Sequence, residues 1–254
     1  MQIYVVKEGD NVDSIAAEFN VLVQTIIFDN QLVYPYKLAV GQALLINDGQ
    51  VKDNRRTAVI RGFAYPFISR YVLSQSLPAL SELAIFSYGF TAEGDLVYPI
   101  LEDNELIQMT YFYGAKPILT LTPLGPEGNF SNELISAVIN NESAIENLIN
   151  NLLYVMEQKG FLGLDIDFEY IKAEDRQQFV NFVALVTERM NAVGYTVSVD
   201  LAPKISATQQ GLLYEGKDYA ALGAVANSVL VMTYEWGYTY GPPMVYWLHY
   251  SRNK

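Results

Sequence analysis

The stretch Gly163-Leu164-Asp165-Ile166-Asp167-Phe168-Glu169-Tyr170 decides the fold class. Acidic and apolar residues alternate along it, and successive side chains of a β-strand point to opposite faces. We therefore expect a strand over 163–170 that gathers Asp165, Asp167 and Glu169 on one face and the intervening apolar residues on the other. An apolar face of this kind suits a helix-covered exterior, so the acids are expected to face the interior of a barrel.

Three carboxyl groups on one interior face are unfavourable for stability, because charged groups in a low-dielectric environment raise one another's pKa. Such an arrangement is expected where one carboxyl must stay protonated near neutral pH and act as a general acid. The alternative, an exposed strand with solvated acids, leaves the apolar residues on its other face unexplained. The pattern therefore favours an acid–base catalytic site.

The chain around this stretch alternates β-type runs with helical stretches, which predicts a parallel sheet with helical crossovers. Several strands end in residues suited to chemistry, which favours a (β/α)8 TIM barrel whose site lies at the carboxyl ends of its strands. We predict five further strands and two long helices, at 59–65, 83–88, 116–121, 196–201 and 229–234, and at 143–159 and 173–193. Residues 58–254 fall short of the roughly 250 residues typical of this barrel, so we expect it to be truncated after about six strands.

A second, smaller pattern occupies residues 1–47. A β-type run at 3–6 leads through a turn at Lys7–Asp10 to a helix that Asp13-Ser14 is expected to cap and Asn20 to end. A second helix and a closing strand at 43–46 follow, which predicts a small α+β unit of βααβ order. The polar, charged stretch 48–57 is expected to be a linker.

Composition excludes several classes of partner. The net charge is −12, so nucleic acid and anionic membranes are disfavoured. No apolar run reaches the length of a membrane span, and the N-terminus has no recognisable signal peptide. There is no cysteine, which removes disulfides and thiolate ligands. Nineteen tyrosines, twelve phenylalanines and two tryptophans suit a neutral polyhydroxylated ligand, although many of them are expected to fill the core.

The N-terminal unit resembles the LysM domain, a module that binds N-acetylglucosamine-containing glycans. The matching residues are Tyr4–Asp10, Ile15-Ala16, Asn30 and Leu38–Ile46. The resemblance implies a binding groove that involves Gly9, Asp10, Asn11 and the stretch from Asn30 to Leu38. A turn-forming role alone remains the alternative for Gly9 and Asp10.

The larger unit resembles family 18 glycoside hydrolases. Their signature Asp-x-x-Asp-x-Asp-x-Glu is matched by Asp165, Asp167 and Glu169, whereas Leu162 stands where the first Asp would lie. Further matches are Phe86-Ser87-Tyr88, Met232-Thr233-Tyr234 and Glu235-Trp236-Gly237. The last of these resembles the branch of spore germination and spore-cortex N-acetylglucosaminidases, in which LysM modules precede the barrel.

The resemblance implies substrate-assisted, retaining hydrolysis of peptidoglycan at the spore or cell wall, without a cofactor or metal. Glu169 would be the general acid, Asp167 would orient the substrate's acetamido group, and Asp165 would share a proton with Asp167. Tyr234 would bind the acetamido group. Substrate contacts are expected from Trp236, Glu235 and Tyr88 in the barrel, and from Gly9, Asp10 and Asn30 in the LysM unit.

Two alternatives remain open. In the first, the truncated barrel is catalytically inactive and the chain binds peptidoglycan or chitin through its LysM domain. A chitinase acting on fungal or insect chitin fits less well, because of Leu162 and the spore-type flank. Residues 245–254 match nothing expected of the family, as in a truncated or frameshifted gene product.

Overall fold

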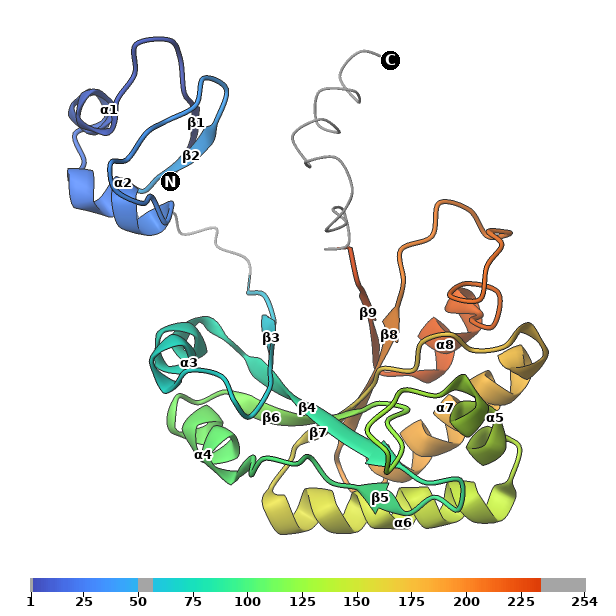
Figure 1. The fold of residues 1–254 in the computed structure, drawn as a ribbon. Coiled ribbons are helices and arrows are strands. Elements are labelled where there is room, and N and C mark those ends of the chain that lie inside the picture. The colour runs from blue at the N-terminus through green and yellow to red at the C-terminus, as the bar shows by residue number, and fades with distance from the viewer. Residues whose placement is uncertain (1, 50–56, 234–254) are drawn as a thin grey trace. The chain divides into compact units, whose positions relative to one another are not determined.

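The structure is a computed structural model, and it describes residues 2–49 and 57–233. The chain divides between Ala58 and Val59 into two compact units, each with a hydrophobic core of its own (Figure 1). Residues 50–56, which make up most of the linker predicted at 48–57, lie outside the described ranges.

The N-terminal unit has the predicted βααβ order. It consists of β1 (Gln2–Val5), α1 (Val12–Phe19), α2 (Val23–Asp29) and β2 (Ala43–Ile46). β1 and β2 pair antiparallel, with Tyr4 opposite Leu44. These two residues are buried together with Ile15 and Ile26 from the helices, so the pair of strands and the two helices share one core.

Helix α1 begins two residues earlier than predicted. Its N-cap is Asn11, whose Oδ1 accepts a hydrogen bond from Ser14 N at 2.8 Å while Ser14 Oγ accepts one from Asn11 N at 3.0 Å. Asparagine caps as well as aspartate or serine, and this start brings Val12 into the helix and the core. The predicted cap at Asp13-Ser14 is therefore wrong, whereas the predicted end at Asn20 is confirmed by its left-handed backbone.

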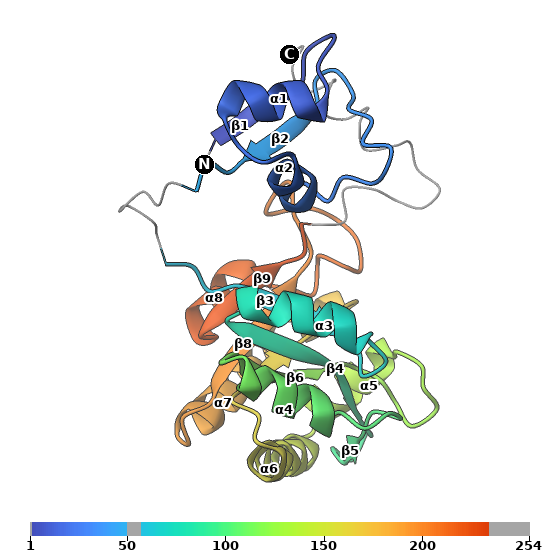
Figure 2. The same ribbon diagram turned by 90° about the vertical axis from the view of Figure 1, so that its left-hand side faces the viewer.

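The C-terminal unit is a curled sheet (Figures 1 and 2). In its described part, six strands run parallel in chain order, and the short β5 (Leu96–Val97) pairs antiparallel with β4. The parallel strands are β3 (Arg61–Ala64), β4 (Glu82–Phe90), β6 (Lys116–Leu121), β7 (Gly163–Ile166), β8 (Thr196–Leu201) and β9 (Ser228–Val231). This is the predicted order for a TIM barrel that stops after six strands.

Helices lie along the outer face of this sheet (Figures 1 and 2). They are α3 (Arg70–Ser76), α4 (Asn104–Phe112), α5 (Asn132–Ile139), α6 (Glu142–Lys159), α7 (Arg176–Asn191) and α8 (Tyr219–Val225), with the 3-10 turns η1 (Leu77–Ala79) and η2 (Ala173–Asp175). Helix α6 begins at the cap Asn141 and ends at Gly160, whose φ of 82° suits glycine. Among the described residues, no helix is both long enough and apolar enough to cross a membrane.

The fourth parallel strand is shorter than predicted, although its alternation is confirmed. β7 ends at Ile166. The next residue, Asp167, still donates its backbone N–H to Leu121 O of β6 at 3.0 Å. The backbone then turns at Tyr170, whose φ is 55°. The Phe168 side chain still lies on the outer face of the sheet, in the core between the sheet and its helices. Its ring packs there against Phe179 and Phe182 of α7. The alternation of inward and outward side chains in residues 163–170 therefore continues beyond the end of β7.

Candidate active site

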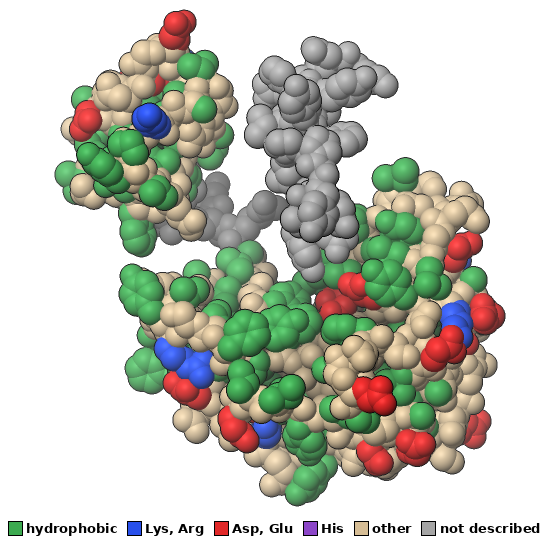
Figure 3. All heavy atoms as spheres, viewed as in Figure 1, with side chains coloured by type: hydrophobic (Ala, Val, Ile, Leu, Met, Phe, Trp, Pro, Cys, Tyr) green, Lys and Arg blue, Asp and Glu red, His purple; other side chains and the backbone are tan. Residues whose placement is uncertain are grey.

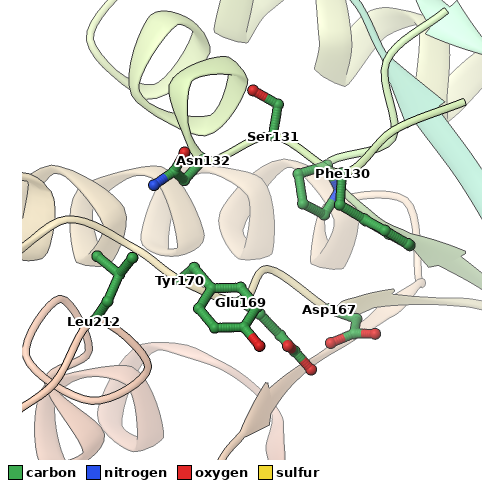
Figure 4. A pocket seen from close by; sticks show the side chains of 8 residues that line it. Phe130, Ser131, Asn132, Asp167, Glu169, Tyr170 and Leu212 are labelled. Carbon is green, nitrogen blue, oxygen red and sulfur yellow. The ribbon is translucent and has the colours of Figure 1, made fainter. Parts of the chain in front are cut away.

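The predicted acids lie on the inner face, at and beyond the carboxyl end of β7. Asp167 and Glu169 both line a cavity of about 330 Å³ (Figure 4). The other lining residues are Pro123, Phe130, Ser131, Asn132, Tyr170 and Leu212. Figure 3 shows acidic side chains recessed among hydrophobic ones in the middle of this unit. Glu169 is half-buried in the wall of this cavity.

Asp165 forms the floor of this acidic array. It is fully buried, and its Oδ1 accepts hydrogen bonds from Arg61 Nη1 at 2.8 Å and from the Ser198 hydroxyl. Burial raises the pKa of Asp165, and the Arg61 charge and the Ser198 hydrogen bond act in the opposite direction. Its Oδ2 is buried and has no hydrogen-bond partner among the described residues.

Asp167 lies between Asp165 and Glu169 on the same face. Burial, followed by the charges of Glu169 and Asp165, raises its pKa to about 7, and Lys217 opposes the rise. Its Oδ1, like Oδ2 of Asp165, is buried and has no hydrogen-bond partner in the described part of the chain. Asp167 can therefore change its protonation state close to neutral pH.

Two further ionisable residues that the sequence analysis missed complete the array. Asp200 on β8 is buried, and burial together with the charges of Asp165 and Asp167 raises its pKa to about 9. Lys217, in the loop before α8, is fully buried, and its Nζ donates to the backbone carbonyl of Asp200 at 2.7 Å. Burial lowers the pKa of Lys217 to about 8.

Some of these residues carry a signal in the sequence. The stretch 197–201 alternates apolar residues with Ser198 and Asp200, which is the pattern that revealed the acids of β7. Arg61 interrupts an otherwise uncharged β-type run, and its Nε also donates to Glu82 at 2.9 Å. Lys217 has no such signal, because it lies in an irregular loop.

The expectation that Tyr88 contacts substrate is wrong. Tyr88 is fully buried in the core on the outer face of the sheet, where its ring packs against Phe161 and its hydroxyl donates to Asp103 at 2.6 Å. The pairing register of β4 shifts between Ile85 and Tyr88, as at a β-bulge. This shift turns Tyr88 to the same side as Ile85, away from the acids.

The LysM candidates have different outcomes. Asn30 uses its side-chain amide on backbone groups: Nδ2 donates to Ile26 O and Leu45 O, and Oδ1 accepts from Leu45 N. It therefore joins α2 to β2, while its expected contact with glycan stays a prediction. Asp10 accepts hydrogen bonds at 2.7 Å from both Tyr4 OH and Lys7 N. Gly9 forms the turn between them with a φ of 87°.

The Tyr4 contact has an electrostatic consequence. The hydrogen bond from Tyr4 lowers the pKa of Asp10, and the same bond raises the pKa of Tyr4 to about 12. Asp10 is thus ionised and stabilises its turn, while a glycan contact of Gly9 and Asp10 stays a prediction. Tyr234, Glu235 and Trp236 lie outside the described residues.

Known proteins match both units. The model of the glycosyl hydrolases family 18 matches residues 120–243, which include the three acids, and the LysM domain model matches residues 4–47. The cortical fragment-lytic enzyme of Bacillus subtilis is 33% identical to this chain over 96% of its length and 68% of the relative's. This chain belongs to the family 18 glycosyl hydrolases.

Further known proteins match most of this chain. The cortical fragment-lytic enzyme of Bacillus anthracis is 32% identical, again over 96% of this chain and 68% of the relative. The crystal structure of the Bacillus cereus spore cortex-lytic enzyme SleL matches with a TM-score of 0.71 and 30% identity, covering 95% of this chain and 55% of that one. The chain thus spans only about half of that solved chain.

Proposed function

We propose that this chain hydrolyses N-acetylglucosamine linkages in spore-cortex peptidoglycan, and that its LysM unit holds the same glycan. The observation that carries the proposal is the pair Asp167 and Glu169 at the wall of one cavity, beside the buried Asp165. The names of its relatives, cortical fragment-lytic and spore cortex-lytic enzymes, indicate the substrate. The same relatives favour a location at the spore or cell wall.

The reaction begins with proton transfer from Glu169. Its carboxylic acid protonates the leaving glycosidic oxygen while the acetamido oxygen of the substrate attacks the anomeric carbon, so that the glycosidic bond breaks and an oxazolinium ion forms. Water then attacks the same carbon, and the Glu169 carboxylate takes up its proton. Two inversions give net retention of configuration.

Asp167 supports the intermediate. Its carboxylate accepts a hydrogen bond from the acetamido N–H and stabilises the positive charge that develops on the oxazolinium ring. Asp165 holds Asp167 in place and shares a proton with it. Oδ2 of Asp165 and Oδ1 of Asp167, which are buried and have no hydrogen-bond partner in the described chain, are the oxygens available for this sharing.

The remaining contacts complete the proposal. Tyr234 hydrogen-bonds the acetamido group, and Trp236 and Glu235 contact neighbouring parts of the sugar chain. Gly9 and Asp10 bind glycan in the LysM unit. The domains comprise 1–47 for the LysM unit, 48–57 for the linker and 58–254 for the hydrolase.

The test is the variant Glu169→Gln, which keeps the shape of the side chain and removes its proton. It should release no reducing ends from purified cortex peptidoglycan, yet sediment with cell walls as the unmodified protein does. Glu188→Gln, on the exposed side of α7, is the matched control and should retain full activity.

Other outcomes contradict the proposal. If the unmodified protein sediments with walls but releases no reducing ends, the chain is a glycan-binding protein with an inactive barrel. If it neither binds nor cleaves an N-acetylated glycan, both functions are excluded.

A further inference from the structure

A buried cation lies among the acids of the site, and the proposed reaction has not yet used it. Lys217 has no exposed surface, and its Nζ donates to the Asp200 carbonyl at 2.7 Å. Its charge interacts with those of Asp167, Glu169 and Asp200, and with the like charge of Lys204. Lys217 therefore lies close to Asp167, Glu169 and Asp200.

The loop that carries Lys217 is fixed on two sides. A Cβ on the preceding Gly216 would lie 2.0 Å from the backbone oxygen of Ile171, so a residue without a side chain is needed at this approach. From the other side, Lys204 Nζ donates to the Lys217 carbonyl at 3.1 Å. The first of these contacts packs Lys217 against the segment that follows Glu169.

Burial of an ammonium group is unfavourable for the fold, because removal of a charge from water costs several kcal/mol even after relaxation. Methionine has a similar size and would fill the space without this penalty. A buried lysine at this position therefore indicates a role for its positive charge other than packing. At neutral pH Lys217 is protonated, since burial lowers its pKa only to about 8 while the three neighbouring acids favour its charged form.

Arg61, the other cation close to the acids in the described part of the site, pairs with different carboxyl groups. Arg61 is paired with Glu82 and with the floor residue Asp165. Without Lys217, Asp167 would lie beside Asp165 and Glu169 with no facing cation in the described part of the site, and burial together with these two like charges would keep it protonated. A neutral Asp167 cannot stabilise a developing positive charge.

We propose that Lys217 is a positioning residue whose buried positive charge favours the ionised form of Asp167, so that Asp167 can stabilise the oxazolinium ion. This inference rests on the proposed function, because the ionised form of Asp167 matters only if the intermediate forms. Lys217 itself contacts neither the substrate nor the reacting atoms in this scheme.

Two substitutions separate the charge from the hydrogen bond. Lys217→Gln can still donate to the Asp200 carbonyl but removes the charge, whereas Lys217→Arg keeps the charge. The titration of the Asp167 carboxyl carbon is followed by ¹³C NMR of aspartate-labelled protein, and Asp167→Asn assigns the signal. We expect the Asp167 midpoint to rise by about one to two pH units in Lys217→Gln and to stay near its original value in Lys217→Arg.

The pH profile of kcat/KM gives a second readout. Loss of a cation raises the pKa of every nearby acid, so both limbs of the profile should move to higher pH in Lys217→Gln and stay in place in Lys217→Arg. A merely structural lysine would lower the melting temperature of Lys217→Gln without moving either limb. Unmoved Asp167 titration in a folded Lys217→Gln variant overturns the proposal.

A measurement on the unmodified protein covers the case in which Lys217→Gln does not fold. The Asp167 carboxyl signal should show a second inflection at the pH where the Lys217 Cε signal titrates, and its absence overturns the proposal. The titrations do not depend on catalysis. If they behave as expected while the unmodified protein releases no reducing ends, Lys217 controls Asp167 and the proposed hydrolysis is what fails.

Discussion

Arg61 Nη1 lies 2.8 Å from Asp165 Oδ1, although two strands of the sheet separate the strands that carry these residues. In a flat sheet β3 and β7 would be about 14 Å apart, which is three strand spacings and farther than one arginine side chain reaches. The ion pair therefore requires the curl of the sheet. It joins β3 to β7 across the inner face of the curled sheet and holds the Asp165 carboxyl group in place.

Removal of Arg61 should destabilise the C-terminal unit strongly. Arg61→Met leaves the buried Asp165 without its cation, and breaking one side of a buried pair costs about 3–5 kcal/mol. Urea unfolding at pH 7 measures the loss. The matched control is Arg70→Met, because the exposed pair Arg70–Glu105 should contribute less than about 1 kcal/mol.

The double variant Arg61→Met with Asp165→Asn sharpens this test. It removes the uncompensated charge together with its partner, so much of the lost stability should return. Equal losses in Arg61→Met and Arg70→Met would show that the ion pair does not hold the curl.

Stability should fall as pH rises through the neutral range. Folding raises the pKa of Asp167 to about 7 and that of Asp200 to about 9, so above about pH 4 the folded state holds protons that the unfolded chain has released. The free energy of unfolding then decreases with pH, by up to about 1.4 kcal/mol per pH unit for each group.

The pH prediction is measured by urea midpoints between pH 5 and 7.5. This range lies below the point where Lys217, with its pKa lowered to about 8, loses its proton and contributes the opposite trend. Asp200→Asn cannot ionise, so its stability should fall less steeply over the range. Identical slopes in the two proteins would contradict the raised pKa of Asp200.

Tyr88→Phe should affect stability and leave hydrolysis unchanged. The substitution keeps the ring in the core but removes the hydrogen bond to the buried Asp103, at a cost of about 1–3 kcal/mol. Tyr98→Phe, on a half-exposed ring nearby, should stay within about 0.5 kcal/mol. Loss of hydrolysis at unchanged stability in Tyr88→Phe would restore the expectation that this residue meets substrate.

Asn30→Ala should lower the stability of the LysM unit, and any loss of glycan binding should follow from that lower stability. The variant leaves the Leu45 N–H and carbonyl without their side-chain partner and should cost about 2 kcal/mol or more. Hydrogen exchange of α2 amides in the full chain measures the loss, and Asn11→Ala, a helix cap worth about 1 kcal/mol, provides the scale. Weaker sedimentation with walls at unchanged exchange would mean that Asn30 contacts glycan.

Alternation predicted the parts of the fold in which a strand is regular and one face is covered. The bounds of β6 and β8 match the predicted ranges, and the acids of the β7 stretch face inward because Phe168 remains anchored in the core. The same reasoning failed at Tyr88, since the register shift in β4 depends on pairing with β6 and reverses the faces.

The electrostatic part of the site could be predicted only in part. Asp200 follows the alternation of β8, but Lys217 enters the site from an irregular loop whose path depends on the close approach of Gly216 to Ile171. No periodic pattern encodes such a contact. The predicted residues 234–236 lie outside the described chain.

The two acidic partners of Arg61 become available at different times during synthesis. Glu82 follows it by 21 residues, whereas Asp165 follows it by 104. On a ribosome, the guanidinium can pair with Glu82 as soon as β4 has emerged, long before the acid at the centre of the site exists. Glu82 therefore provides a counter-charge for Arg61 before Asp165 has been synthesised, and it keeps this contact in the folded chain.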